Sequence, residues 1–183
     1  RPRPPGHQHR ERRPSDGNIP CHGVPLTPAT TLTTYSVENA LQLIERSQVK
    51  YNVLKRNGVF YFCNGVGPRG IRNRSIMNAA TALRLLDFRA VHKKDAKLAD
   101  AANVIYPATG VPKVALAGNE YLPGSVVDNV TSFGGFLLDS RGHTTLTDLA
   151  RAGVCGGYGT VVEPTNIPTR WPEFSMPVNY AQG

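Results

Sequence analysis

The feature that most constrains the fold is an alternation of short apolar runs with helix-like patterns between residues 35 and 164. A short apolar run between turn signals is typical of a buried strand, and apolar residues three or four positions apart indicate a helix. The expected strands are residues 58–64, 89–93, 103–110, 113–118, 124–135 and 157–164. The expected helices are residues 36–47, 76–88, 96–101 and 144–153. This alternation predicts an α/β fold: a mostly parallel sheet with helices on both faces, in three layers.

Two of the expected helices carry end signals. Ser36 is a favourable N-cap, because its hydroxyl can accept a hydrogen bond from a free amide of the first turn. Thr145 and Asp148 have the spacing of a capping box, and Gly153 suits the C-terminal end of the same helix. The face that we expect the first helix to bury consists of Val37, Ala40, Leu41 and Ile44.

The two ends of the chain differ in composition from its middle. Residues 1–34 are rich in Pro, Arg, Thr and Gly without periodicity, which indicates an extended arm. Residues 165–183 are punctuated by prolines, and we expect them to form a loop on the sheet edge, anchored by aromatic side chains such as Trp171, without a closing helix. The expected organisation is an Arg/Pro-rich arm (1–34), an α/β domain (35–164) and a Pro-rich C-terminal extension (165–183).

The composition excludes several function classes. The net charge is +8, but the basic residues do not form a stripe interleaved with aromatics, which argues against nucleic-acid binding. No apolar run approaches the roughly 18 residues of a membrane span. The three cysteines include no C-x-x-C pair, and the candidate ligands of the arm (His7, His9, Cys21 and His22) are loosely spaced, so we expect no metal and no cofactor. Whether Cys21 and Cys63 form a disulfide is left open.

Candidate binding residues follow from the rule that ligands lie beyond the carboxyl ends of parallel strands. The glycine-containing loop at 65–74 carries Arg69, Arg72 and Arg74 between a strand and a helix, where amides and guanidinium groups can hold an anion. Its GVGPRG run has the spacing of a dinucleotide fingerprint, but the acidic residue that should follow is missing, and Pro68 removes one amide donor. A solvated turn is the competing interpretation.

Polar residues also occur in and after two later strands. Asp128 lies within an apolar run, so we expect it either to pair with a basic group or to face the strand-end cleft. Ser132 lies between Thr131 and Phe133 in the run V-T-S-F-G, which does not fit the G-x-S-x-G of a nucleophile elbow; a hydrogen bond to its own turn is the simpler interpretation. Glu163 lies at the end of the last expected strand, where it can line the same cleft.

Cys155 in "RAGVCGGYGT" is the candidate nucleophile of the chain. It needs a general base, and His143 is the nearest histidine in the sequence, with His92 a second candidate. However, Cys155 precedes its strand and therefore lies at the end opposite the expected site. A buried, structural cysteine is the competing interpretation.

The stretch "YLPGSVVDNVTSFGGFL…TTLTDLARAGVCGGYGTVVEP" resembles a family of uncharacterised, mostly exported bacterial proteins that share a TSFGG…RAGAxxSYGTVxEP core. The likeness is dense from about residue 103 to residue 164 and does not include the arm. More distantly, the topology is similar to that of caspases and gingipains. Their catalytic histidine would fall near Ala108 or Thr109 and their cysteine at Phe133, so the resemblance implies a cleft without the catalytic dyad.

These observations predict a non-catalytic binding or assembly domain of an exported or envelope-associated protein, located in the periplasm, at the cell surface or outside the cell. The arm would wrap a protein partner or a second copy of the chain. The first alternative is a cysteine-dependent hydrolase that uses Cys155 with His143. The second is an anion-binding module at Gly65–Arg74. The expected binding residues are Arg69, Arg72, Arg74, Asp128, Ser132 and Glu163, with no catalytic residue and no metal.

Overall fold

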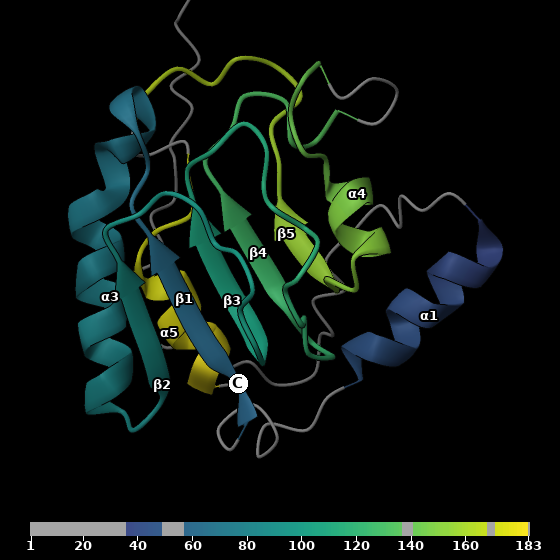
Figure 1. Ribbon diagram of the computed structural model, residues 1–183, viewed down its shortest axis with the longest axis horizontal. Coiled ribbons are helices and arrows are strands. Elements are labelled where there is room, and N and C mark those ends of the chain that lie inside the picture. The colour runs from purple at the N-terminus through teal and green to yellow at the C-terminus, as the bar shows by residue number, and fades with distance from the viewer. Residues whose placement is uncertain (1–35, 49–56, 137–140, 168–170, 183) are drawn as a thin grey trace, which may run out of the picture. The chain divides into compact units, whose positions relative to one another are not determined.

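The computed structural model describes residues 36–48, 57–136, 141–167 and 171–182 (Figure 1). By its internal contacts the chain divides into two units, Arg1–Thr31 and Leu32–Gly183, and all described residues belong to the second. The expected arm and its candidate metal ligands lie outside the described residues.

The described chain is built on one sheet of five strands in which all neighbours are parallel (Figure 1). The strands are β1 (Val59–Cys63), β2 (Arg89–Lys93), β3 (Val104–Thr109), β4 (Val126–Asn129) and β5 (Gly156–Tyr158). Their order in the sheet is β2-β1-β3-β4-β5. The predicted α/β fold with a parallel sheet is therefore confirmed, and the carboxyl ends of all five strands lie at one edge.

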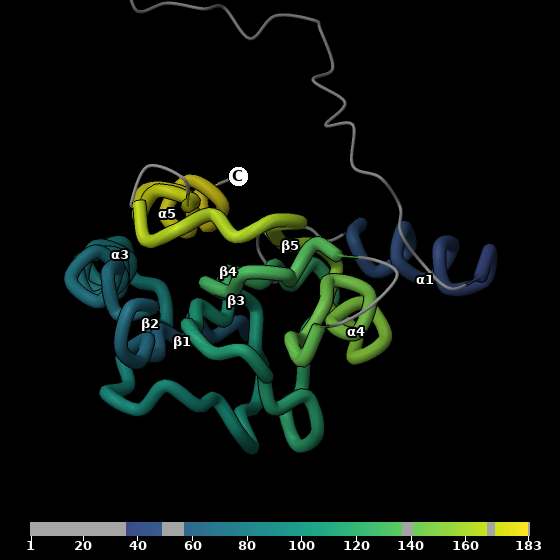
Figure 2. The backbone as a smooth tube through the Cα atoms, turned by 90° about the horizontal axis from the view of Figure 1, so that it is seen from above, coloured from purple at the N-terminus to yellow at the C-terminus, as the bar shows by residue number. Residues whose placement is uncertain are grey.

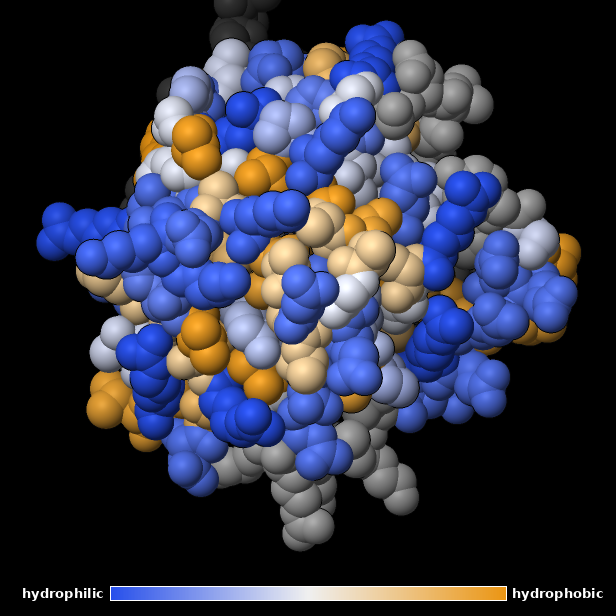
Figure 3. Space-filling model, viewed as in Figure 1, coloured by the Kyte–Doolittle hydropathy of each residue, from blue (hydrophilic) through white to orange (hydrophobic). Residues whose placement is uncertain are grey.

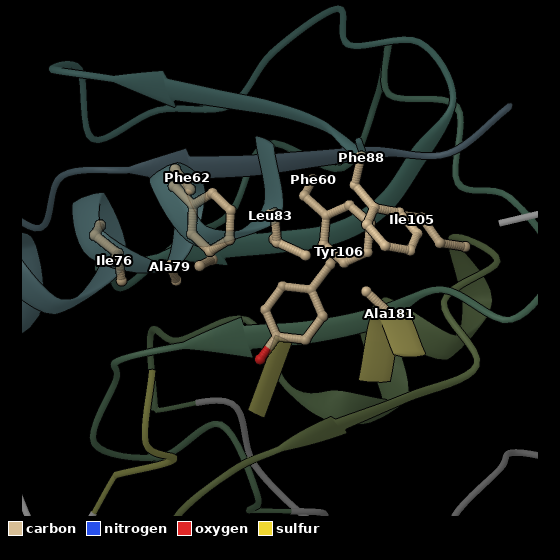
Figure 4. Close-up of a cluster of buried hydrophobic side chains, with 11 residues drawn as sticks. Phe60, Phe62, Ile76, Ala79, Leu83, Phe88, Ile105, Tyr106 and Ala181 are labelled. Atoms are coloured by element: carbon tan, nitrogen blue, oxygen red, sulfur yellow. The ribbon is translucent and has the colours of Figure 1, made fainter. Parts of the chain in front are cut away.

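Helices α3 (Asn73–Leu85) and α5 (Ser175–Gln182) cover one face of the sheet (Figure 2). Their apolar residues meet the side chains of β1 and β3 in the largest core cluster (Figure 4). Phe60 and Tyr106 stack there with ring centroids 6.0 Å apart, and Ala181 of α5 is fully buried. Aromatic side chains thus fill most of the space between the sheet and these two helices.

The opposite face is covered by the connection between β3 and β4, by the segment after β2, and by helix α4 (Leu146–Arg151) (Figure 2). Leu98 packs on Cys63 and Val104, and Leu149 of α4 packs on Val127. Figure 3 shows the face seen in Figure 1; hydrophilic residues cover most of it, with apolar residues between them near the middle.

The predicted end signals are confirmed. In α1 (Val37–Ser47) the Ser36 hydroxyl accepts a hydrogen bond from the Asn39 amide. In α4, Thr145 and Asp148 form both bonds of a capping box, and Gly153 has a φ of +102° just after the helix. The predicted apolar face of α1, however, is not buried: Val37, Leu41 and Ile44 are exposed, and the helix has no buried residue.

Three other predictions of secondary structure are wrong. Residues 96–101 form no helix, because Asp100 has a φ of +52° that an α-helix does not allow. Residues 113–118 form no strand, because the side-chain amide of Asn119 binds the carbonyls of Leu98 and Ala115, and that stretch is tied locally instead of to the sheet. The C-terminal segment closes with a helix, α5, because Pro177 near its start is compatible with a first turn and Ala181 is buried in the core.

The last predicted strand is also much shorter than expected. Only Gly156–Tyr158 pair with β4, and they are exposed at the outer edge of the sheet, so the expected buried strand over 157–164 is wrong. The chain leaves the sheet at Gly159, whose backbone crosses that of Gly135 so closely that a Cβ on Gly159 would lie 2.4 Å from the Gly135 nitrogen. The Gly135 amide donates to the Thr160 carbonyl at this crossing.

A candidate ligand cleft at the carboxyl edge of the sheet

The order of the strands along the sheet reverses between β1 and β3, and a parallel sheet of this order usually opens a crevice at that point. In this protein the short helix η1 (Gly67–Arg72), which follows β1, closes that crevice. A Cβ on Gly110 would lie 2.7 Å from the Cα of Gly65, and one on Gly65 would lie 2.2 Å from the Arg69 carbonyl oxygen. Glycine is therefore required at both positions. The open cleft at this edge of the sheet lies closer to β4 than to the point between β1 and β3.

This cleft has a volume of about 240 Å³ and lies beyond the carboxyl ends of β1 and β4. The lining residues are Pro68, Arg69, Val130, Thr131, Ser132, Glu163, Asn166 and Trp171. Three of the residues predicted from the sequence, Arg69, Ser132 and Glu163, are thus brought together from segments far apart in the chain.

A larger and more open groove of about 840 Å³ adjoins the cleft along the segment that follows β5. Residues Tyr158, Gly159, Thr160, Val161, Val162, Glu163, Pro164, Trp171, Pro172 and Met176 line it. Glu163 and Trp171 belong to both hollows. Val161 and Val162 are 55% and 67% exposed, so the groove presents apolar side chains to the solvent.

Trp171 lines both hollows, whereas the sequence pattern predicts for it only the role of an anchor. Its side chain is buried, at 6% exposure, and its ring packs edge-on against Tyr158 at a centroid distance of 6.1 Å. Within the described part of the chain the indole Nε1 is buried without a hydrogen-bond acceptor. The signal available in the sequence was that Trp171 is the single tryptophan of the chain, in a segment with prolines.

A hydroxyl–imidazole pair lies beside the cleft. The Oγ1 of Thr131 shares a hydrogen bond with Nδ1 of His143, whose ring meets Phe133 edge-on. Burial lowers the pKa of His143, the charge of Arg69 lowers it further, and Glu163 acts in the opposite direction. His143 is therefore neutral near pH 7. Because Thr131 is only 2% exposed, its hydroxyl is not presented to a substrate.

Asp128 and Arg72, both predicted as binding residues, form a buried ion pair instead. The two guanidinium nitrogens donate to the two carboxylate oxygens at 2.8 and 2.7 Å, and Arg72 and Asp128 are 6% and 2% exposed. Burial by itself would lower the pKa of Arg72, but the hydrogen bonds and charge of Asp128 outweigh it, and the pKa is raised. The Tyr106 hydroxyl also donates to the Asp128 carboxylate, at 3.4 Å. Of the two roles expected for Asp128, the structure selects pairing with a basic group.

The three arginines of the loop at 65–74 do not converge. Arg72 is bound to Asp128, Arg74 is exposed on α3, and only Arg69 lines the cleft. The Gly65 amide, which an anion would need, donates to the side chain of Asn73 at 2.8 Å. Two of the donors expected for an anion cradle are therefore already used within the protein.

The pairing of Cys155 with His143 is contradicted by their positions. The Cys155 amide donates to the Ser125 carbonyl and its sulfur accepts from the Gly124 amide, both at the amino end of β4. His143 contacts Thr131, beyond the carboxyl end of β4, and the four residues of β4 between the two ends span about 13 Å at roughly 3.3 Å per residue. Burial raises the pKa of Cys155. The second candidate base, His92, binds Asn64 at the carboxyl edge too.

Comparisons of the chain with protein-family models, with curated proteins and with solved structures give no match. The resemblance to exported bacterial proteins accordingly stays a prediction. In the described part of the chain, no group of three or more His, Cys, Asp or Glu side chains could hold a metal ion. None of the described helices is long and apolar enough to cross a membrane.

Proposed function

We propose that this α/β domain is non-catalytic and binds an extended segment of a partner protein across the cleft and the adjoining groove. The observation that carries the proposal is that Glu163 and Trp171 line both hollows, so one ligand can occupy them together. Exposed Val161 and Val162 supply apolar surface of the kind that peptide side chains bury.

The absence of catalysis in this proposal is supported by the groups near the cleft. The hydroxyl of Thr131 is hydrogen-bonded to His143 but almost fully buried, and Ser132 lacks the glycine-flanked turn of a nucleophile elbow. Cys155 lies at the far end of β4 with a raised pKa. A nucleophile must be both activated and accessible, and neither Thr131 nor Cys155 combines the two.

Location outside the cytoplasm and assembly through the arm are part of the same proposal. The location is supported by the resemblance of residues 103–164 to exported proteins. The role of the arm is supported by its composition alone, since residues 1–34 lie outside the described residues.

The binding function can be tested with a random peptide library displayed on phage and selected on the immobilised full chain. We expect enrichment of peptides with apolar residues, and we expect Val162→Asp to abolish their binding, because a carboxylate would then lie within the apolar groove. Leu85→Asp is the matched control, because Leu85 is 83% exposed at the last position of α3, away from the groove. The proposal is wrong if no peptide is enriched, or if the enriched peptides bind the Val162→Asp protein as well as the original.

A further inference from the structure

We infer that the partner segment binds as an added β-strand, antiparallel to β5, with its backbone paired to the outward N–H and C=O of Gly157. The inference rests on the proposed function and names the way in which the extended segment is held. It commits to one occupant, a strand that carries apolar side chains at alternate positions and a basic residue near its amino end.

Strand β5 has an open backbone edge. It is the last strand of the sheet, and among the described strands it pairs only with β4 (Figure 1). The Gly156 amide donates to the Ser125 carbonyl on the β4 side. Because successive residues of a strand direct their backbone groups to opposite sides, the N–H and C=O of Gly157 point away from β4. All three residues of β5 are exposed, so a further strand can reach these two groups.

The opposite edge of the sheet, β2, carries protection that β5 lacks. Arg89 and Lys93 are charged residues of that strand, and Nε of Arg84 donates to the Ala90 carbonyl at 2.8 Å. Charged side chains on an edge strand disfavour the addition of another strand. The sequence of β5, Gly-Gly-Tyr, contains no charged residue. Of the two edges, β5 is therefore the one that accepts a partner strand.

The single outward residue of β5 favours an antiparallel partner. In an antiparallel pair one residue exchanges both hydrogen bonds with the residue opposite it, whereas a parallel strand must use two different residues. Antiparallel addition therefore satisfies both backbone groups of Gly157 with one residue of the partner. The amino end of the partner then lies toward Gly159, where the groove begins.

The two faces of β5 define the side chains of the added strand. A Cβ on Gly157 would lie 2.9 Å from the Leu146 side chain, so position 157 points to the face covered by α4. Tyr158 points to the other face, where its ring packs against Trp171. The partner residues on either side of the one opposite Gly157 lie on that same face, beside the groove. Apolar side chains suit those two positions.

The charge of the groove defines the amino end of the partner. Among the described residues that line the groove, Glu163 alone is charged, and it is exposed. Val161 and Val162, which precede it, are exposed apolar residues. A segment that carries Lys or Arg before its alternating apolar residues therefore matches the groove in both charge and polarity.

The probe is the acetylated peptide amide Lys-Thr-Val-Thr-Val, and its binding is measured by the fluorescence of Trp171, the single tryptophan of the chain. With its second threonine opposite Gly157, both valines lie on the Tyr158 face, and the threonine amides point to β5. Methylation of both threonine nitrogens should lower the affinity about tenfold or more, because the Gly157 carbonyl loses its donor. The isomer with both valine nitrogens methylated is the matched control and should bind like the parent peptide, because those amides point to solvent.

Hydrogen exchange of the protein tests the same contact from the other side. With saturating probe, the exchange of the Gly157 amide in the isotope-labelled full chain, followed by NMR, should slow about tenfold or more, because the amide becomes hydrogen-bonded. The Gly156 amide is the internal control, because it already donates to the Ser125 carbonyl. Its exchange should change much less.

Gly156→Lys gives β5 the kind of protection that β2 has. The added Cβ would lie 3.9 Å from its nearest contact, a Val126 methyl group, so the backbone can accept the substitution. The affinity for the probe should fall about tenfold or more, because the added strand would desolvate the new ammonium group. Leu85→Lys is the matched control, because it adds the same charge at an 83% exposed position of α3.

Three results overturn strand addition: equal affinities of the two methylated isomers, a Gly157 amide that exchanges as fast with the probe as without it, or failure of the probe to bind at millimolar concentration. Unchanged binding to the Gly156→Lys protein overturns it as well. Each of these results leaves the peptide-binding function standing if the phage selection yields peptides that depend on Val162. An empty phage selection is the separate result that removes the function itself.

Discussion

The buried pair of Arg72 and Asp128 makes the sharpest prediction about this protein. Asp128→Asn keeps the shape of the side chain but leaves the Arg72 guanidinium buried without a counter-charge. Removing one partner of a buried ion pair costs about 3–5 kcal/mol of unfolding free energy. That is a large share of the ~5–15 kcal/mol by which domains are stable, and it corresponds to a fall in Tm of about 6–20 °C for a chain of this length.

The pairing itself is tested by a double-mutant cycle. Arg72→Met alone should also be strongly destabilising, because Asp128 then loses both short hydrogen bonds. The double variant Arg72→Met/Asp128→Asn carries no buried charge, so its cost should be smaller than the sum of the two single costs by about 2 kcal/mol or more. Arg89→Met is the control for loss of one positive charge, because Arg89 is exposed in β2, and it should change stability by less than about 0.5 kcal/mol.

The assay is urea unfolding followed in parallel by far-ultraviolet circular dichroism and by tryptophan fluorescence. Coincident transitions establish that unfolding is two-state and that the free energies can be compared. The reasoning is refuted if Asp128→Asn costs less than about 1 kcal/mol, or if the costs of the two single substitutions simply add.

Three further predictions follow from contacts away from that pair. Gly159→Ala should lower the unfolding free energy by about 1–3 kcal/mol, because its Cβ would lie 2.4 Å from a backbone nitrogen. Gly156→Ala should cost far less, because the nearest contact of its Cβ would be at 3.9 Å. Equal urea midpoints for the two variants would refute this prediction. In the folded protein Cys155 should react slowly with iodoacetamide, since burial raises its pKa, and Cys63 should not react, since burial raises its pKa to about 11. Mass spectrometry of the modified peptides gives the two rates, and fast labelling of either cysteine would contradict the prediction. Because the pKa of His143 is lowered in the folded protein, the unfolded chain binds the imidazole proton more tightly. The contribution of neutral His143 to the stability of the fold is therefore full above the unfolded pKa of about 6.5, and it is lost as the pH falls through the pKa of the folded protein. His143→Gln should therefore lose less stability between pH 7.5 and pH 5 than the unaltered protein, and identical losses would exclude the effect.

The sequence predicted those elements whose signals are local. The Ser36 cap, the capping box at Thr145 and the left-handed Gly153 all depend on residues within a few positions of one another, and all three are present in the structure. The core strands β1 and β3 were predicted close to their observed bounds, because continuous apolar runs suit strands that are covered on both faces.

Errors occurred where distant residues override a local pattern. Val161 and Val162 look like part of a buried strand, yet the chain turns away from the sheet because Gly159 and Gly135 cross there, 24 residues apart in sequence. Helix α5 was missed because Ala181 gains its burial from aromatic residues of β1 and β3, far earlier in the chain.

The candidate site divides in the same way. The parallel sheet and the residue types at its carboxyl edge are consequences of the sequence pattern, and Arg69, Ser132 and Glu163 could be named from it. The sequence does not show which arginine forms the ion pair with Asp128, nor that Cys155 and His143 lie at opposite ends of β4. Both depend on contacts between residues that are far apart in the chain. The placement of Trp171 beside Arg69 likewise exists only after the C-terminal segment has folded back over the strand ends. A sequence pattern specifies which face of an element is apolar, but the partner of a buried charge and the lining of a cleft are decided only when the elements pack together.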